Sequence, residues 1–429
     1  MSIYQYEQAF GAADKTTALM RKAIERWFSM YYEATAGETA DPCQRIPYTV
    51  VNKLVRAVFG EYTATANTPF GQKVLESLNT QKRHAMQLAL VGGACYIKPC
   101  PGKTGFSFTL VPRDQVLIFG RDPAGNPTDV GLVERSAQGN DYYTLLERRQ
   151  VDENGYLTIT NRLFRSRDSR NLGGEVPLKN VPAYSNLAER YCYEKPVGSV
   201  GLAEMKLPML NCVDGSCDGV SVYAAAEGLI RNIDQNEAQM SGEFSRGESR
   251  IIASRDLLDG QLGLQDHLFV GLDEDPEQVG ITVFSPKLRE ESYLARKQEY
   301  LRNVESLLGL KRGMLSDANL EDRTATEIES SAAEYSLTVM DFQTLWQETA
   351  EKVMELCRIL AELYHFSEKD PGQLRFDWGN GNFHDQEKIW ADYMDMVAKG
   401  ILKPEVALAW RFGLAGEDEA TIRQKYMPN

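Results

Sequence analysis

The apolar residues of the chain recur with several different periods, and the longest uninterrupted period is helical. No proline or glycine lies between Thr324 and His365, so one helix of about 42 residues, roughly 63 Å long, can form there. Two overlapping capping boxes, Thr324–Glu327 and Thr326–Glu329, mark its start. Its apolar positions follow no strict heptad, which predicts a broad face that packs against several neighbours. The alternative to a helix that packs against several neighbours is a long helix inside an ordinary helical domain.

The first half of the chain combines helical and strand periods. Turn residues separate the strand-like segments, and among them Asn154-Gly155 is a hairpin signal. We expect an antiparallel meander packed with helices, and therefore an α+β fold class. The predicted helices lie over residues 14–35, 48–59 and 70–91, and the predicted strands over 95–98, 106–111, 116–119, 130–133, 142–146 and 156–160.

The second half is mostly helical, with one small β insert. We expect helices over 216–244 and 290–308, separated by an acidic, turn-rich segment at 248–286. A polar loop at 310–323 precedes the long helix. The remaining predicted elements are strands at 249–253, 267–270 and 280–284 within the insert, a strand at 374–378, and helices at 385–399 and 404–411.

Length and composition narrow the class of protein. The 429 residues are 43% hydrophobic and 25% charged, as in a folded chain with two or more packed units. Lysine and arginine number 47 against 61 aspartates and glutamates, a net charge of −14. Such a chain is a poor candidate for tight wrapping of nucleic acid, although nucleic acid can still slide past it. Neither a signal sequence nor a run of 18 apolar residues is present, so we expect a cytoplasmic chain without a membrane segment.

Motifs for catalysis and metal binding are scarce. The seven cysteines form no C-x-x-C pair, which predicts reduced and mostly buried thiols rather than a zinc site. Pro101–Thr104 lacks the earlier glycine of a phosphate-binding loop, so a hairpin turn is expected there. Asp273–Asp275 lacks the glycine and final glutamate of an EF-hand and is interpreted as an acidic turn. Only the carboxylates Asp377, Asp385 and Glu387 suggest a metal-dependent nuclease. The sequence favours a structural or binding role without cofactors.

Segments spread along most of the chain resemble, in their order, phage portal proteins, in particular the portals of long-tailed phages of Gram-positive hosts. The resemblance covers residues 45–425. The segments that carry it are Leu90–Lys98, Val111–Ile118, Pro196–Gly201, Asp218–Tyr223, Glu243–Ile252, Arg323–Ile328, Phe376–Trp378 with Asp385, and Val397–Leu402.

The resemblance implies an architecture, namely a portal-type protomer with an α+β wing, a two-helix stem, a small β-containing clip, a tunnel loop, a very long helix and a short helical crown. In the numbering of this chain the implied parts are the wing at 1–214, stem helices at 215–246 and 288–309, the clip at 247–287, the tunnel loop at 310–323, the long wing helix at 324–366, and a return strand with a small crown at 367–429.

The resemblance also implies a role. Portals form homo-oligomeric rings, usually of twelve subunits, at one capsid vertex, and double-stranded DNA passes through them without sequence-specific contacts. They dock the terminase large subunit during packaging and later the head–tail adaptor, and they assemble with major capsid and scaffold proteins. They have no catalytic activity and no membrane partner. The implied location is therefore the virion, after assembly in the host cytoplasm.

Two groups of charged residues are candidate sites under this resemblance. In the tunnel loop, Lys311, Arg312 and Arg323 are candidates for light contact with DNA phosphates; the alternative is that they pair with Asp317, Glu321 and Asp322. The acidic clip is the candidate docking surface for terminase and adaptor, and its alternative is simple solubility of an exposed hairpin. The clip residues are Asp256, Asp259, Asp266, Asp273, Glu274, Asp275 and Glu277.

Two other functions remain open at this point. The sequence also permits another kind of virion structural protein, namely a minor capsid or adaptor component. Such a protein would not form a closed ring of twelve chains. A metal-dependent nuclease or transferase centred on Asp377 and Asp385 is the enzymatic alternative.

Overall fold

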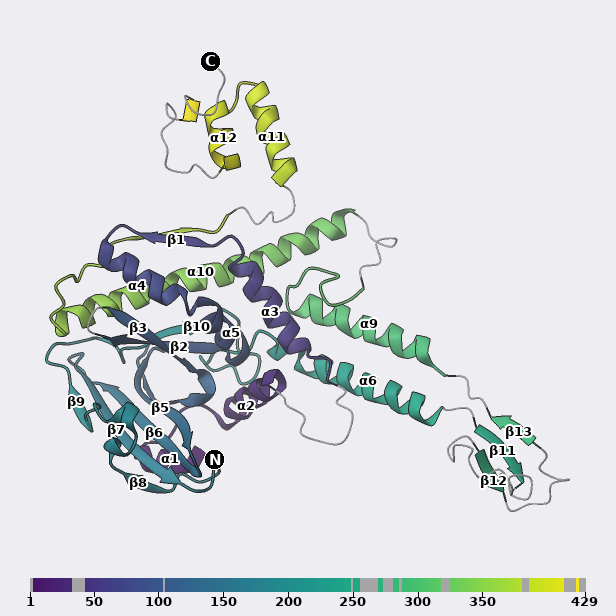
Figure 1. The fold of residues 1–429 in the computed structure, drawn as a ribbon, viewed down its shortest axis with the longest axis horizontal. Coiled ribbons are helices and arrows are strands. Elements are labelled where there is room, and N and C mark those ends of the chain that lie inside the picture. Colours follow the sequence, from purple (N-terminus) through teal and green to yellow (C-terminus); the bar gives the residue numbers. More distant parts are fainter. Residues whose placement is uncertain are drawn as a thin grey trace. The chain divides into compact units, whose positions relative to one another are not determined.

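The chain divides into two compact units, which we describe separately (Figure 1). The first unit comprises Met1–Phe59 and Ala64–Phe376, and the second comprises Gly60–Thr63 and Asp377–Asn429. The structure is a computed structural model, and it describes residues 3–32, 43–102, 105–247, 250–254, 269–272, 281–284, 288–317, 325–379, 386–412 and 422–423.

The helices of the first unit confirm most of the predicted ones and differ from the prediction in three places. The predicted helix at 70–91 is two helices with a break at Thr80-Gln81. The helix predicted from 216 begins only at Glu227, and a helix at the N-terminus was not predicted. The helices are α1 (Ile3–Phe10), α2 (Ala18–Tyr32), α3 (Ile46–Val58), α4 (Pro69–Asn79), α5 (Lys82–Gly92), α6 (Glu227–Arg246), α9 (Glu290–Leu307) and α10 (Ala325–Leu363).

Local chemistry explains several of these boundaries. The side chain of Thr68 accepts a hydrogen bond from the Gly71 amide at 3.1 Å and starts α4, with proline at the first helical position. Gly93, at φ +83°, ends α5 in the left-handed conformation that glycine adopts without strain. The end of α10 is marked by His365 at φ +56°.

The strands of the first half form two sheets rather than the single predicted meander. The strands β2 (Ala94–Pro101) and β3 (Phe106–Pro112) pair antiparallel, and β2 also pairs with β10 (Ala203–Lys206). The next strands do form an antiparallel meander, in the order β4-β5-β6-β7-β8, with β9 against β7. Its members are β4 (Val116–Arg121), β5 (Pro127–Gln138), β6 (Asp141–Val151), β7 (Leu157–Ser166), β8 (Gly174–Val176) and β9 (Arg190–Cys192).

In the described residues, two further sheets contain the remaining strands. Between α6 and α9 in the sequence, β11 (Arg250–Ser254) pairs in parallel with β12 (Phe269–Leu272) and antiparallel with β13 (Ile281–Phe284). These strands confirm the β character of the predicted insert. The strands β1 (Thr63–Ala66) and β14 (Leu374–Asp377) pair across more than 300 residues of sequence.

The long helix α10 is observed close to its predicted start and end, but it is buried along only part of its length. Its C-terminal half packs against α3, α4, β2 and β10, where Trp346, Val353 and Cys357 have no exposed surface. The ring of Trp346 meets the ring of Phe59 edge to face, with centroids 5.5 Å apart. This half of the helix is therefore part of the core of the first unit.

A buried charge network joins the two larger sheets. Glu147 on β6 accepts hydrogen bonds from Lys98 on β2 at 2.6 Å and from Arg149 at 2.5 Å. Arg149 also donates to the carbonyl oxygens of Val200 and Gly201, at 2.9 and 3.2 Å. Burial alone would raise the pKa of Glu147, but the positive charges of Arg149 and Lys98 outweigh it and lower the pKa to about 2.

The Glu147→Gln substitution is expected to lower the free energy of unfolding at pH 7 by about 3 kcal/mol. Because the folded pKa lies below the ordinary glutamate value of 4.5, this stabilisation is complete above about pH 4.5 and is lost as the pH falls toward 2. Urea unfolding of the wild type and of Glu147→Gln between pH 7 and pH 3 measures the difference in their free energies of unfolding. This difference is expected to decrease as the pH falls. The control is Glu175→Gln, whose exposed pair with Arg162 contributes less than about 1 kcal/mol. A pH-independent difference would contradict this role of Glu147.

The second unit contains two short helices, as predicted. They are α11 (Gln386–Ala398) and α12 (Pro404–Phe412), and the rings of Tyr393 and Trp410 pack between them with centroids 5.1 Å apart. Arg423 pairs with Glu405 at 3.0 Å.

Candidate functional site

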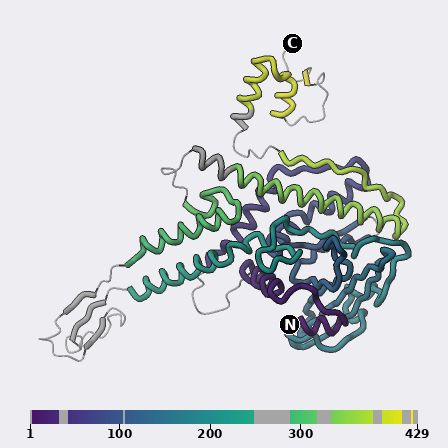
Figure 2. The backbone as a smooth tube through the Cα atoms, turned by 180° about the vertical axis from the view of Figure 1, so that it is seen from behind, coloured from purple at the N-terminus to yellow at the C-terminus, as the bar shows by residue number. Residues whose placement is uncertain are grey.

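The helices α6 and α9 form an antiparallel pair, as both views of the backbone show (Figures 1 and 2). Arg289 donates to Glu243 with Nη2 at 2.8 Å, and Lys297 donates to Glu237 at 3.0 Å. Hydrogen bonds from Arg289 lower the pKa of Glu243 to about 2. Asn236 donates to the carbonyl oxygen of Tyr293 at 3.1 Å. Polar contacts therefore hold the two helices together over residues 236–243 and 289–297.

Apolar packing supports only one half of this pair. Ile230, Ile233, Leu301 and Val304 are buried near the body of the first unit. In the other half, residues 237–247 and 288–300, no described side chain is buried. Phe244 and Leu294 are 43% and 44% exposed there. Helical stability in proteins comes mostly from a packed face, and this half of the pair has no such face within the described chain.

The N-terminal part of α10 has a second exposed apolar surface. Leu337 is 62% exposed and Met340 is 57% exposed, and the two lie one turn apart. This observation agrees with the broad apolar face predicted for the long helix, because part of that face is not covered by the described chain.

The loop after α9 contains the described cations of the predicted tunnel loop. Residues 309–317, which we call the 309–317 loop, place Lys311 and Arg312 in exposed positions. Arg312 donates to the carbonyl oxygen of Arg302 at 3.2 Å. Lys311 forms no ion pair with Asp317 or with any other residue that the structure describes. Arg323, Glu321 and Asp322 lie outside the described residues.

Three of the segments singled out in the sequence meet at one point, which we call the junction and define as Gly93, Arg113, Asp218 and Gly219. Arg113, almost fully buried, donates to Asp218 at 3.2 Å and to Thr16 at 2.8 Å. Arg121 donates to the same carboxylate oxygen at 2.6 Å. A Cβ atom on Gly93 would lie 2.3 Å from the carbonyl oxygen of Gly219, so the two backbones are in direct contact.

The junction attaches the segment that leads into α6 to the body of the first unit. Just beyond Gly219, the Val222 amide donates to the carbonyl oxygen of Leu90 at 2.9 Å. The hydroxyl of Tyr223 donates to the carbonyl oxygen of Trp27 at 2.7 Å. The position of α6 therefore depends on these contacts. The sequence contains no clear signal for the junction, because Arg113 begins the polar run Arg113–Gln115 and its partner Asp218 lies 105 residues away.

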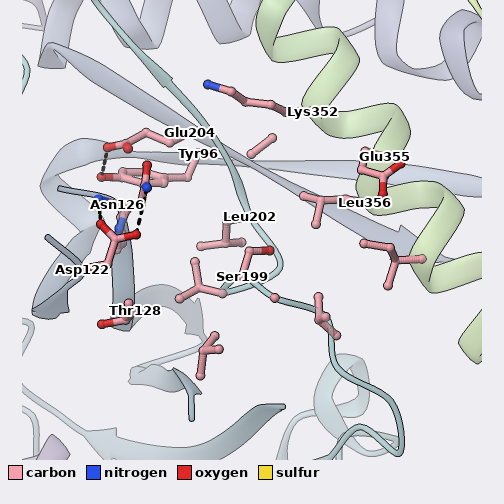
Figure 3. Close-up of a pocket in the computed structure, with 17 residues that line it drawn as sticks. Tyr96, Asp122, Asn126, Thr128, Ser199, Leu202, Glu204, Lys352, Glu355 and Leu356 are labelled. Atoms are coloured by element: carbon pink, nitrogen blue, oxygen red, sulfur yellow. Dashed lines mark hydrogen bonds between the residues drawn. The ribbon is translucent and has the colours of Figure 1, made fainter. Parts of the chain in front are cut away.

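A cavity of about 510 Å³ lies between α10 and the β10 region (Figure 3). Leu202, Val200 and Leu356 give it an apolar wall. Four of its polar side chains pair with one another, since Tyr96 donates to Glu204 at 2.8 Å and Asn126 donates to Asp122 at 2.9 Å. The residues that line it include no histidine or cysteine and no arrangement of a nucleophile with a base.

The other predicted chemistry is placed as follows. The carboxylate of Asp377 accepts from the Gly379 amide at 3.0 Å, as in a turn, while Asp385 lies outside the described residues. Pro101-Gly102 forms the predicted hairpin turn, with the Gly102 amide donating to Gly105 at 2.8 Å. In the described part of the chain, no group of three or more histidine, cysteine, aspartate or glutamate side chains is arranged to hold a metal ion. The clip acids Asp256, Asp259, Asp266, Asp273, Glu274, Asp275 and Glu277 also lie outside the described residues.

The cysteines are not mostly buried, contrary to the prediction. Cys95 and Cys357 are buried, and burial raises the pKa of both thiols. Cys192, Cys212 and Cys217 are exposed because they lie in strand-edge and loop positions. None of the helices searched, which are those of the described residues, is apolar over a length that would span a bilayer.

Comparison with known proteins gives one family. The sequence profile of the family described as "Phage portal protein, SPP1 Gp6-like" matches residues 131–424, more than half of the chain. Among solved structures, the chain is similar to a chain of the "Neck of native GTA particle computed with C12 symmetry", with 13% sequence identity and a TM-score of 0.49, over 96% of this chain and 99% of that chain. No curated protein matches the sequence.

Proposed function

Because the chain belongs to the SPP1 Gp6-like family of phage portal proteins, we propose that it forms a closed ring, of about twelve copies, at one vertex of a phage capsid. The ring is the channel through which double-stranded DNA is packaged and released. The family is structural, and we propose that the chain itself performs no catalysis. The match to the family over residues 131–424 carries this proposal.

In this proposal the parts of the chain have the portal roles expected from the sequence. Residues 1–214 form the wing, α6 and α9 form the stem, and residues 247–287 form the clip. Residues 310–323 form the tunnel loop, α10 is the long wing helix, and residues 367–429 form the return strand and crown. The order of the observed elements supports this assignment, since a polar helical pair, a small sheet between its members, a loop and a 39-residue helix follow one another.

The exposed surfaces of the first unit support assembly. A ring built from head-to-tail contacts needs two different interfaces on each chain. The half of the α6–α9 pair without buried side chains and the exposed Leu337–Met340 surface of α10 are two separate surfaces of this kind. Neighbouring copies in the ring would cover them.

The net charge suits a channel that does not retain its cargo. Twelve copies with −14 each total about −168. Acidic walls repel the phosphates of duplex DNA, so no register along the channel traps the DNA by strong attraction. Lys311 and Arg312 provide light contact with phosphates in this proposal, together with Arg323.

The proposed partners follow from the same role. The terminase large subunit docks during packaging and a head–tail adaptor docks afterwards, both on the acidic clip. Major capsid and scaffold proteins surround the ring during assembly in the host cytoplasm, and the mature ring is part of the virion.

The native mass of the purified chain tests the proposal against its alternatives. Light scattering is expected to give about 580 kDa for twelve copies of a 48.2 kDa chain. A minor capsid or adaptor protein would not reach a closed assembly of this mass. A magnesium-dependent activity on DNA that is lost in Asp377→Asn and Asp385→Asn variants would instead support a nuclease.

A further inference from the structure

Glu305 is a carboxylate without exposed surface in the last turn of α9. It forms no ion pair with any residue that the structure describes. A buried carboxylate without a cation is costly, and the C-terminal end of a helix disfavours negative charge further. A leucine at this position would cost less, so the stability of α9 alone does not explain the glutamate.

The partners of Glu305 are all in the 309–317 loop. Its Oε1 atom accepts hydrogen bonds from the backbone amides of Leu315 and Ser316, at 2.6 and 2.9 Å. Its Oε2 atom accepts from the hydroxyl of Ser316 at 2.8 Å. Three donors from two consecutive residues therefore satisfy one buried carboxylate.

Other residues on the same face of α9 hold both ends of this loop. Gln298 accepts from the Asp317 amide at 2.8 Å, and the carbonyl oxygen of Arg302 accepts from Arg312 at 3.2 Å. The positions 298, 302 and 305 are spaced by four and three residues, which places them on one stripe of the helix. Lys53 on α3 donates to the carbonyl oxygen of Met314. The loop is thus attached to α9 along a stripe, and Glu305 makes the most buried of these attachments.

Two glycines shape the part of the loop that contains the cations. Gly309 is at φ +59° and Gly313 is at φ +85°, and both conformations favour glycine. A Cβ atom on Gly309 would lie 2.5 Å from the hydroxyl oxygen of Thr338 on α10. Lys311 and Arg312 therefore lie on a short turn between two glycines, with Glu305 holding its far end.

We propose that Glu305 is a positioning residue that latches the 309–317 loop to α9 and so fixes where Lys311 and Arg312 are presented. The purpose of this latch rests on the proposed portal function. In a portal, the latch makes the 309–317 loop move together with α9 as one body. The two cations of each chain then meet DNA at a position that the helix sets.

Trypsin cleavage after Lys311 and Arg312 in the full-length protein tests the latch. The protease needs residues 313–316 in an extended form, so the latch must open before cleavage. Glu305→Leu removes the hydrogen bonds and keeps the volume, and it is expected to accelerate cleavage roughly tenfold or more. Glu305→Gln still accepts from both amides and can donate to Ser316, so its cleavage rate is expected to stay within about twofold of the wild type. The control Glu299→Gln changes an exposed glutamate of the same helix.

The proposal would be overturned if trypsin cleaved the wild type and Glu305→Leu at the same rate while both proteins had the same melting temperature. If Glu305→Leu fails to fold, hydrogen exchange of the wild type decides. The amides of Leu315 and Ser316 are expected to be the most protected of the loop, and fast exchange at both would refute the latch. The cleavage test can be made on a ring or on a monomer, so a failed latch is distinguishable from a failed portal assignment.

Discussion

Replacing Leu337 and Met340 together by aspartate is expected to abolish ring formation and to leave a folded chain of 48.2 kDa. The two side chains are more than half exposed on the N-terminal part of α10. Each large apolar side chain that a neighbour covers contributes about 1.5–3 kcal/mol. An aspartate in its place adds the cost of burying a charge. The effect is repeated at every interface of a ring, so assembly is lost rather than weakened.

Light scattering and thermal unfolding together check this result. The melting profile of the isolated chain is expected to change little, because neither side chain packs inside the first unit. The matched control is Leu337→Met with Met340→Leu, which keeps an apolar surface and is expected to keep the native mass. A double aspartate variant with the mass of the wild type would show that this surface is not an interface.

The second large effect is expected from Asp218→Ala, which leaves Arg113 buried without the carboxylate that pairs with it. Asp218 accepts from Arg113 at 3.2 Å and from Arg121 at 2.6 Å, in a site where its own side chain is 7% exposed. Breaking a buried ion pair by removing one partner costs about 3–5 kcal/mol. Since the junction also attaches the segment before α6, the loss of stability is expected to be accompanied by a loss of ordered α6–α9 pairing.

Denaturant unfolding measures the first effect, and hydrogen exchange in α6 measures the second. The control is Asp129→Ala, which removes a more exposed pair with Arg148 and is expected to cost about 1 kcal/mol or less. If the Asp218 and Asp129 variants lost equal free energy of unfolding, the burial of the junction would not explain the effect of Asp218→Ala. Other contacts would then have to attach α6 to the first unit.

The comparison of sequence and structure shows which features were local enough to predict. The start and end of α10 were predicted from two possible capping boxes and from the absence of proline and glycine, and the observed helix is Ala325–Leu363. The turn at Asn154-Gly155 was predicted from two residues, and the structure has Gly155 at φ +82° between β6 and β7. The apolar periodicity and the turn residues that predict such an element belong to the element itself.

The missed features depend on residues far apart in the sequence. The meander splits because β10, about 100 residues after β2, pairs with it and draws β2 and β3 into their own sheet. The break between α4 and α5 at Thr80-Gln81 interrupts a helical period that continues through it. Arg113 and Glu305 looked like ordinary charged residues, because only the fold shows that one is buried against Asp218 and the other under the 309–317 loop.

The candidate site residues also divide into those that were singled out before the fold was known and those that only the fold identified. Lys311 and Arg312 are exposed in the structure, and they were singled out because the resemblance to portal proteins implies a tunnel loop at 310–323. Their role as phosphate contacts remains a prediction, as does the docking role of the acidic clip. The residues that position them, Glu305 and Gln298 on α9, have helical spacing from one another but no sequence signal that identifies the loop as their partner.

Electron microscopy of the purified full-length chain tests the central claim most directly. We expect rings with a central hole, about twelve-fold symmetric in end view, at the mass that light scattering gives for the same sample. If the chain is monomeric alone, the measurement is repeated with scaffold protein present, because ring closure can depend on it. Rings under either condition agree with a portal. A chain that remains monomeric under both conditions would contradict the assignment of this protein as a ring-forming channel.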